Sequence, residues 1–426
     1  MKIVTEINDV LKDSIKSNQN IFVQGAMQTP TFLLSKLEEA LREREDVENL
    51  KFLHLHTHGE PFYIRDEFKN RCKTLNFFVG ANVRKSLDFT QVDYIPCFLS
   101  EIPYLLRDGV LKNDIALIQV SRPNEHGYVS LGTSVDITKE AVKTASIVIA
   151  QINEEVPLIH GDSFIHTSDI TYGVYKNENL HYSKKLLPTE NELKIGKSIA
   201  ELIEDGSTLQ MGIGAIPDAV LSSLTNHKDL GIHTEMFSNG IIELTQKGII
   251  TNKYKKINPG KTISSFAVGT KELRDFMCNN PSVELYPANY VNKPKNIAKN
   301  PRVVAINSAV EIDLTGQVCA DSIGSHIISG VGGQMDFIRG ASISHEGKPI
   351  IAMCSTTKSG KSKIVSTLIN GAGVVTTRAH VHYVATEYGC VNLYGKSIGK
   401  RAKLLTSIAH PKHREDLERA WKEILS

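Results

Sequence analysis

The sequence lacks the long apolar runs and the charge excess that mark several large classes of protein. It contains no stretch of 18 consecutive apolar residues, which predicts no transmembrane helix. The opening residues, MKIVTEINDVLKDS, carry acidic groups at once and no apolar core, so we expect no secretory leader. Basic and acidic side chains number 49 and 47, for a formal net charge of +2, so neither nucleic acid nor an anionic membrane is an expected partner.

Paired cysteines are also missing. The six cysteines are scattered without a C-x-x-C pair, at positions 72, 97, 278, 319, 354 and 390. This pattern predicts free thiols in a reducing compartment rather than a disulfide or zinc framework, so we expect a cytoplasmic protein. With 426 residues the chain exceeds what one hydrophobic core usually supports, which predicts two domains of about 200 residues each.

Short apolar runs rich in β-branched residues alternate with helix-like segments along the whole chain. In the first half these runs are IFVQG (21–25), FLHLHT (52–57), FFVG (77–80), IALIQV (115–120) and SIVIAQI (146–152). The second half continues with TLQMG, ISSFAVG, VVAINSAV, IIAMC and VVTT. Alternating strands and helices predict an α/β fold with βαβ units and largely parallel sheets. The polar, weakly periodic segment 170–190 predicts a boundary between an N-terminal domain, 1–180, and a C-terminal domain, 181–426.

An internal similarity supports two related halves. The segment GAMQTPTFLLSKL at 25–37 matches GIGAIPDAVLSSL at 212–224, with the same glycine-to-proline spacing and the same later Leu, Ser and Leu positions. Each copy follows an apolar strand and precedes a predicted helix with proline in its first turn. The second copy has two glycines, Gly212 and Gly214, which let a ligand approach the backbone closely. We therefore expect the second domain to hold an anionic cofactor.

The turn that contains these glycines is a candidate site for an anion. A strand that leads directly into a helix N-terminus offers free N–H groups to a phosphate or an oxyanion. The sequence resembles the dinucleotide pattern G-x-G-x-x-G, but Pro217 replaces the third glycine. A simple tight turn between strand and helix explains the same residues equally well.

Glu235 is a candidate nucleophile. In GIHTEMFSNG, at 231–240, we predict a strand that ends in a Ser-Asn-Gly turn and surrounds this carboxylate with apolar neighbours. Partial desolvation makes a carboxylate more nucleophilic. A surface position or an ion pair is the competing interpretation of the same carboxylate.

Two further glycine-rich segments are candidate ligand sites. In SGVGGQMDF, at 329–337, three glycines in four positions can form a backbone nest for developing negative charge, or simply a flexible turn. The segment SGKS at 359–362 ends like a phosphate-binding loop, but Ser355 occupies the position of the loop's first glycine, which excludes nucleotide hydrolysis. Lys358 remains a candidate contact for the phosphates of a cofactor.

The histidines raise a different hypothesis. His54, His56 and His58 alternate in a predicted strand, which places all three on one face, as metal ligands require. No partner carboxylate is identifiable from the spacing, so hydrogen-bonded strand histidines are the preferred interpretation and no metal is expected.

Taken together, several long motifs resemble the acetyl-CoA hydrolase/transferase family, which includes 4-hydroxybutyrate, butyrate and acetate CoA-transferases. The motifs that carry the resemblance are, in chain order, FFVGANVRKS, YIPCFLSEIP, SRPNEHGYVSLGTSVD, GDSFIHTSDI, LQMGIGAIPDAV, GIHTEMFSNG, AINSAVEIDLTGQV, GVGGQMDFIRGA and VVTTRAHVHYVATEYGCVNLYGKSIGKRAKLLTSIAHPKHREDL. They cover the chain almost from end to end.

The resemblance implies two repeated open α/β domains of the class I CoA-transferase type, with the active site between them. It also implies coenzyme A as the cofactor-like substrate, a short-chain carboxylate as the second substrate, and a homodimer or larger homo-oligomer. The family's nucleophile falls on Glu235, which implies a ping-pong mechanism through acyl-glutamyl anhydride and glutamyl-CoA thioester intermediates. The family's oxyanion donors and CoA contacts fall on Gly212, Ile213, Gly214, Ala215, Ile216, Gly332 and Gly333.

Two rival functions follow from the same residues. An acyl-CoA hydrolase would use the same intermediate on Glu235 but let water resolve it. A metallohydrolase would instead depend on His54, His56 and His58. None of these motifs identifies the two acids.

Overall fold

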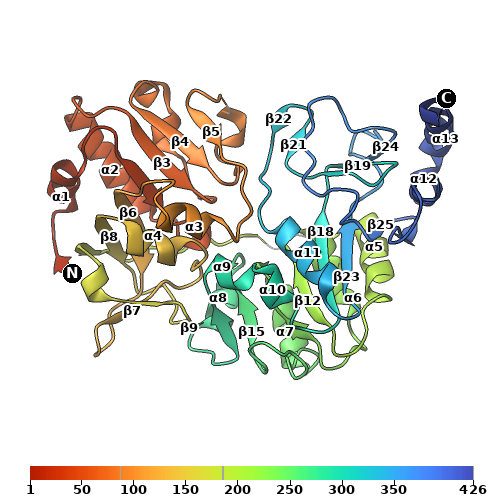
Figure 1. Ribbon diagram of the computed structural model, residues 1–426. Coiled ribbons are helices and arrows are strands. Elements are labelled where there is room, and N and C mark those ends of the chain that lie inside the picture. The colour runs from red at the N-terminus through yellow and green to blue at the C-terminus, as the bar shows by residue number, and fades with distance from the viewer. Residues whose placement is uncertain (87, 185–186, 426) are drawn as a thin grey trace. The chain divides into compact units, whose positions relative to one another are not determined.

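A computed structural model describes residues 1–86, 88–184 and 187–425 (Figure 1). The chain forms two compact units, one of Met1–Lys184 with Ile263–Val291 and one of Lys185–Thr262 with Asn292–Ser426. The first division lies close to the predicted boundary after residue 180. Residues 263–291 also belong to the first unit, so each unit is made of two separate segments of the chain and a single boundary does not describe the division.

Unit 1 is built on an eight-stranded sheet in which every pairing is parallel. Its strands, in spatial order, are β1 (Lys2–Ile3), β11 (Tyr172–Tyr175), β8 (Ile147–Ile152), β6 (Ile115–Val120), β2 (Asn20–Val23), β3 (Leu50–His54), β4 (Cys72–Asn76) and β5 (Val92–Tyr94). Its helices are α1 (Ile7–Ser14), α2 (Thr31–Glu43), α3 (Ile102–Arg107), α4 (Thr138–Thr144), α8 (Lys271–Met277) and α9 (Ala288–Val291).

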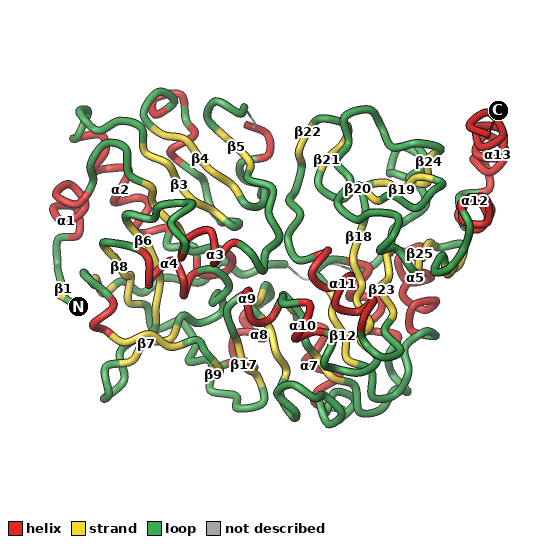
Figure 2. Tube along the Cα trace, in the orientation of Figure 1, coloured by secondary structure: helices red, strands yellow, loops and turns green. Residues whose placement is uncertain are grey.

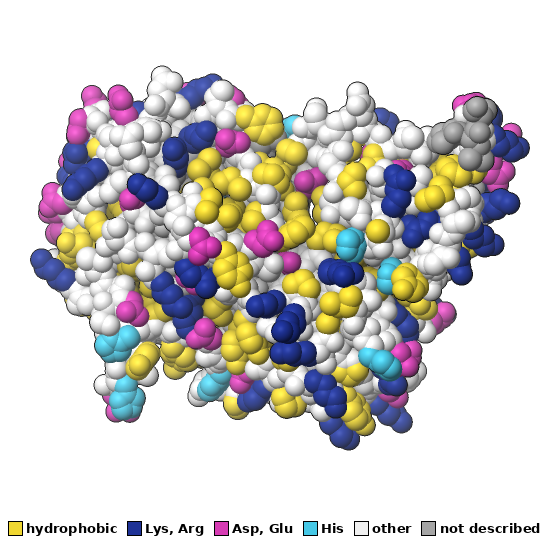
Figure 3. Space-filling model, in the orientation of Figure 1, with side chains coloured by type: hydrophobic (Ala, Val, Ile, Leu, Met, Phe, Trp, Pro, Cys, Tyr) yellow, Lys and Arg dark blue, Asp and Glu magenta, His cyan; other side chains and the backbone are white. Residues whose placement is uncertain are grey.

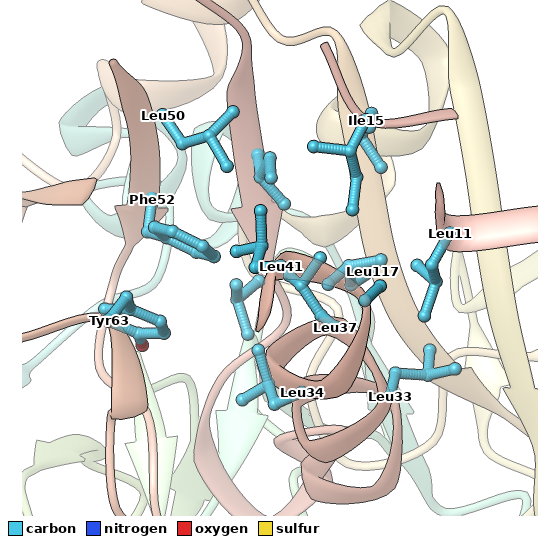
Figure 4. Close-up of a cluster of buried hydrophobic side chains, with 14 of the residues drawn as sticks. Leu11, Ile15, Leu33, Leu34, Leu37, Leu41, Leu50, Phe52, Tyr63 and Leu117 are labelled. Atoms are coloured by element: carbon cyan, nitrogen blue, oxygen red, sulfur yellow. The ribbon is translucent and has the colours of Figure 1, made fainter. Parts of the chain in front are cut away.

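The apolar core of unit 1 explains why α2 is helical. Leu33, Leu34, Leu37 and Leu41 recur at helical spacing and pack with Phe52 of β3 (Figure 4). Alternate residues of β2, β3 and β6 face this helix, while their neighbours face the other side of the sheet and, apart from the half-buried Asn20 and Lys51, are also buried. Burial of both faces is what a parallel sheet requires.

Backbone hydrogen bonds explain why residues 263–291 belong to unit 1. This segment begins within β15 (Thr262–Ser264) and carries β16 (Phe266–Ala267) and β17 (Val283–Leu285), the last of which pairs in parallel with β9 (His160–Gly161). The N–H of Ala267 donates to Thr133 O at 2.9 Å, and the N–H of Ala288 donates to Asp136 O at 2.9 Å. A short antiparallel pair, β7 (Tyr128–Ser130) with β10 (Phe164–His166), completes the strands of this unit.

Unit 2 contains a six-stranded sheet with five parallel strands and one antiparallel edge (Figure 2). In spatial order these are β13 (Gly231–Ile232), β12 (Thr208–Met211), β18 (Val303–Ser308), β23 (Lys348–Ala352), β25 (Tyr383–Thr386) and β26 (Gly389–Asn392). The helices are α5 (Glu190–Ala200), α6 (Ala215–Ser223), α7 (Gly240–Gln246), α10 (Pro294–Ile297), α11 (Gln334–Ile343), α12 (Ile398–Ser407) and α13 (Pro411–Leu425). Shorter strands are β14 (Met236–Phe237), β19 (Glu311–Asp313), β20 (Val318–Cys319), β21 (Ser322–Ile323), β22 (His326–Ile327) and β24 (Ile364–Val365).

The predicted α/β fold with parallel sheets is confirmed, although some predicted elements are wrong. FFVG at 77–80 lies after the end of β4, and VVTT at 374–377 forms only an isolated bridge between Val318 and Thr376. The segment 170–190, predicted to link the domains, contains β11. These short apolar runs do not show from sequence alone whether a neighbouring strand lies within hydrogen-bonding distance. Among the described helices, none is both long enough and apolar enough to cross a bilayer.

Candidate active site

Glu235 lies where the edge of the unit 2 sheet bends. The strand predicted around it is interrupted: β13 ends at Ile232, Glu235 occupies a bend, and β14 begins at Met236. Its side chain is half-buried, whereas His233 and Thr234 before it are fully buried. The predicted Ser-Asn-Gly turn is the start of α7, for which Asn239 is the N-cap residue. The bend therefore separates this carboxylate from the regular strand.

The carboxylate of Glu235 is held by Asn292 and Gly333. Asn292, which is 0% exposed and follows α9, donates a hydrogen bond from Nδ2 to Glu235 Oε2 at 2.8 Å. Gly333 is the N-cap residue of α11, and a Cβ atom at this position would overlap both Glu235 Oε2 and Asn292 Nδ2. Only glycine therefore leaves room for the carboxylate at the start of α11.

The start of α11 also contributes an electrostatic field. The first N–H groups of a helix have no partner within the helix, and the helix dipole places partial positive charge there. Gly332 has a φ of +54°, which suits glycine, and both glycines are buried. A carboxylate, or an oxyanion formed from it, is stabilised by such N–H groups.

The glycine turn (residues 212–214) connects β12 to α6 on the neighbouring strand. Gly214 is the N-cap residue of α6 with a φ of +121°, a conformation that demands glycine. A Cβ at Gly212 would meet nothing within 4 Å, and neither would one at Gly214. Gly212 faces open space, so packing within the chain does not explain its lack of a side chain.

The corresponding glycine in unit 1 differs in a useful way. A Cβ at Gly25 would collide with the backbone carbonyl of His56, so packing within the protein accounts for this glycine. The helix after it begins at Thr31, with Pro30 as its N-cap residue, so the prediction of a proline inside the first turn holds for Pro217 but not for Pro30. The contrast favours the turn in unit 2 as the one open to a ligand.

Several lysine side chains of unit 2 are exposed to solvent. Lys293, Lys295 and Lys299 are exposed on or beside α10, and lysine and arginine side chains gather over this helix on the face drawn in Figure 3. Lys358 lies in an exposed tight turn in which the N–H of Thr357 donates to Lys361 O at 2.8 Å. The turn leads into β24 rather than into a helix, in agreement with the exclusion of a nucleotide-binding loop. A contact of Lys358 with a cofactor phosphate stays a prediction.

His54, His56 and His58 do not form the predicted row. β3 ends at His54, so His56 and His58 lie in the following loop and do not share a strand face with it. His54 Nε2 lies 2.7 Å from the hydroxyl of Tyr63, and burial lowers the pKa of His54 to about 3. The ring of His58 stacks on His181 with centroids 5.5 Å apart, and burial also lowers its pKa.

The metallohydrolase hypothesis therefore has no structural support from these residues. Among the described residues, no group of three or more His, Cys, Asp or Glu side chains is arranged to hold a metal ion. The strand prediction was wrong because the backbone bends out of the sheet at Leu55. Beyond this bend, His56 O accepts a hydrogen bond from the N–H of Ala26 at 3.0 Å, and Ala26 lies shortly after the end of β2.

The comparisons with known proteins identify the family. The N-terminal domain of the acetyl-CoA hydrolase/transferase family matches residues 2–182, and its C-terminal domain matches residues 269–421. The chain is 50% identical to a succinyl-CoA:acetate/propanoyl-CoA:succinate CoA transferase of Fasciola hepatica, over 95% of this chain and 85% of the relative. The chain belongs to the acetyl-CoA hydrolase/transferase family.

Other members of the acetyl-CoA hydrolase/transferase family are similar over nearly the whole length. A 4-hydroxybutyrate coenzyme A transferase of Clostridium kluyveri is 46% identical over 99% of this chain and 97% of its own. The crystal structure of a 4-hydroxybutyrate CoA-transferase from Porphyromonas gingivalis is 38% identical, covers 99% of this chain and 98% of its own, and superposes with a TM-score of 0.84. The resemblance drawn from the sequence motifs is thus confirmed.

Sequence reasoning missed one residue of the candidate site. Asn292 lies 57 positions after Glu235 and within none of the motifs that carry the family resemblance, in YVNKPK. Its Oδ1 is buried and has no hydrogen-bond partner among the described residues. A lone asparagine two residues before Pro294 predicts only a turn, so no local signal identifies it.

Proposed function

We propose that this enzyme transfers CoA between short-chain carboxylic acids and that Glu235 is its nucleophile. The observation that carries the proposal is the half-buried carboxylate of Glu235, fixed by Asn292 against Gly333 at the start of α11. Family membership supports it, because the similar relatives named above are CoA transferases. Coenzyme A therefore enters as part of the substrate, and the second substrate is a carboxylate.

The proposed reaction needs no redox step. The Glu235 carboxylate attacks the thioester carbonyl of the acyl-CoA, the C–S bond breaks, and an acyl-glutamyl anhydride and CoA thiolate are formed. The thiolate then attacks the glutamyl carbonyl, which releases the first acid and leaves CoA as a thioester on Glu235. An incoming carboxylate attacks this thioester, and the same steps in reverse yield the new acyl-CoA.

Each addition passes through a tetrahedral oxyanion, which requires hydrogen-bond donors. We assign this role to N–H groups of three segments. They are the glycine turn (Gly212, Ile213 and Gly214), the first residues of α6 (Ala215 and Ile216) and the start of α11 (Gly332 and Gly333). The open space at Gly212 supports the assignment, because a ligand can approach the backbone there. Binding energy from the remote part of CoA is then available to promote the reaction of the thioester.

Intact-mass spectrometry after incubation with acetyl-CoA tests the nucleophile. We expect the protein to gain the mass of CoA less one water. Digestion with trypsin releases residues 229–247, a peptide with two glutamates, Glu235 and Glu243, so fragmentation of this peptide locates the adduct. Glu235→Gln should abolish the adduct and reduce kcat by a factor on the order of 10⁴ or more. Glu243→Gln is the matched control, and an adduct on Glu243 or elsewhere contradicts the proposal.

The family description also contains hydrolases, and a thiol-release assay separates the two activities. A transferase consumes acetyl-CoA continuously only when an acceptor acid is present, because the acceptor removes CoA from the enzyme. We expect the rate of butyryl-CoA formation to rise with added butyrate and free thiol release without it to be slow. Thiol release that is fast and independent of butyrate assigns a hydrolase. A cytoplasmic location and a homo-oligomeric assembly stay predictions, the latter to be tested by light scattering after size-exclusion chromatography.

A further inference from the structure

One buried hydroxyl joins the segment of Glu235 to the glycine turn. Thr234 is 0% exposed, and its Oγ1 accepts a hydrogen bond from the N–H of Met211 at 3.2 Å. The same Oγ1 lies 2.8 Å from Met211 O and 2.8 Å from Met236 O, so its single proton is shared between two carbonyls. Met211 directly precedes the glycine turn, and Thr234 directly precedes Glu235.

The geometry of the sheet explains why a side chain is needed here. β12 and β13 pair in parallel up to Leu209 and Ile232, and the N–H of His233 donates to Leu209 O at 3.1 Å. Met211 lies two residues further along β12, so its backbone N–H and C=O point toward the same neighbouring strand as those of Leu209. The neighbouring chain has by then bent at Glu235, so the Thr234 hydroxyl pairs with the N–H and C=O of Met211 in place of a backbone partner.

A second hydrogen bond lies on the other side of the glycine turn. Ser238 Oγ donates to Oδ1 of Asp218, in the first turn of α6, at 3.0 Å. The two side chains thus flank Glu235 in sequence, and their partners flank the glycine turn. Relative motion of the nucleophile and the turn would break one bond or the other.

We propose that Thr234 is a positioning residue that fixes Glu235 relative to the glycine turn, with Ser238 as a weaker second contact. This inference rests on the proposed function, because it assumes that both parts act in the same addition step. Without the hydroxyl, the N–H and C=O of Met211 lose their partner and the turn relaxes away from Glu235. A shift of about 1 Å between reacting groups reduces rates by roughly a hundredfold, so the chemical step should suffer more than substrate binding.

The test compares Thr234→Val, which keeps the shape, with Thr234→Ser, which keeps the hydroxyl. We expect Thr234→Val to slow single-turnover formation of the CoA adduct and to lower kcat, each by roughly ten- to a hundredfold. The KM for acetyl-CoA should change by less than about twofold in this variant. Thr234→Ser should restore both rates to within about threefold of the wild type.

Ser344→Ala is the matched control for the loss of a buried hydroxyl. Ser344 Oγ accepts from the N–H of Val303 at 3.3 Å and donates to Asn300 O at 2.7 Å, the same pattern as in Thr234. It follows the last residue of α11, at the end of this helix opposite Gly333. This variant should lose thermal stability and keep the wild-type rate of adduct formation.

The outcomes separate the two proposals. A wild-type protein that forms no adduct on Glu235 refutes the proposed function itself. A wild-type adduct on Glu235, with Thr234→Val reacting at the same rate or Thr234→Ser failing to restore the rate, overturns the positioning role alone. If circular dichroism shows Thr234→Val to be unfolded, Ser238→Ala decides instead, because loss of a half-buried hydroxyl should cost less stability than loss of the fully buried one of Thr234. An adduct rate in Ser238→Ala within about twofold of the wild type would then count against the inference.

Discussion

Replacement of Gly333 by alanine tests the candidate site with one methyl group. The backbone of Gly333, with φ −97° and ψ 8°, is accessible to alanine, so the substitution adds no backbone strain. The distances from the new Cβ to Glu235 Oε2 and to Asn292 Nδ2 would both be well under 3.0 Å, a separation below which real Cβ contacts are essentially never found. Ordinary contact begins near 3.4 Å, so the carboxylate must retreat by a distance on the order of 1 Å or more.

This displacement sets the expected size of the effect. A misplacement of about 1 Å costs roughly a hundredfold in rate, equivalent to about 2.7 kcal/mol of transition-state stabilisation. The N–H groups of α11 remain in place, so binding of CoA should change less than kcat. Stability should fall by about 1–3 kcal/mol, the usual cost of forcing an extra methyl group into a packed site, because Gly333 and Asn292 are both buried.

Steady-state kinetics with acetyl-CoA and butyrate, combined with thermal denaturation, measure both quantities. Gly399→Ala is the control, since Gly399 lies within α12 and a Cβ there meets nothing within 4 Å. Alanine is favoured over glycine inside a helix by up to about 1 kcal/mol, so this variant should match or exceed the wild-type melting temperature with unchanged kcat. A Gly333→Ala enzyme with wild-type kcat would refute the reasoning, because the carboxylate could then not react from its observed position.

The remaining predictions concern other parts of the molecule. Asn292→Asp replaces the amide that donates to Glu235 with a second carboxylate, so the acid limb of the kcat pH profile should move to higher pH; Asn292→Ala removes only the hydrogen bond, so it should move this limb less in the same direction and lower kcat roughly tenfold or more. Gly212→Ala should leave the melting temperature unchanged and reduce kcat/KM, since its methyl group enters space that the protein does not fill; unchanged kinetics would show that no ligand approaches the turn. Burial holds the pKa of His54 near 3, so below about pH 6.5 the unfolded chain binds a proton at this residue that the folded protein does not. The free energy of unfolding should therefore decrease as the pH is lowered through about 6.5. Between pH 7.5 and 5.5 the free energy of unfolding measured by urea denaturation should fall by on the order of 1 kcal/mol from this cause, and His54→Asn should remove this contribution from the pH dependence; an identical dependence in the variant would exclude His54 as the cause.

Periodic and motif-level features of the sequence predicted the architecture well. The runs IALIQV and SIVIAQI became the central strands β6 and β8, because long β-branched segments are buried on both faces of a parallel sheet. The glycine turn was also predicted where it lies, between a strand and a helix, since glycine spacing and a following proline define such a turn locally. Short runs such as FFVG were misassigned because their pairing depends on residues distant in the chain.

The candidate site was predictable only in part. Glu235 and the two glycine-rich segments stand out through motifs, and the resemblance to a family ranked them above the histidines. Nothing local marks Asn292 or Thr234, whose roles depend on what lies opposite them in space. The row of histidines shows the opposite error, because a regular spacing in sequence lost its meaning once β3 ended at His54.

Local sequence therefore determined most of the long strands and the strand–turn–helix units, and it singled out Glu235 as the proposed nucleophile, since each depends on neighbouring residues and on motifs that cover the chain. The surroundings of that carboxylate come from long-range packing. Asn292 and Gly333 follow Glu235 by tens of residues, and their contact with it arises only because α9, α10 and α11 are placed by the folding of the rest of the chain. Hydrogen bonds and steric exclusion act over a few ångströms in space, and no spacing along the sequence specifies those distances.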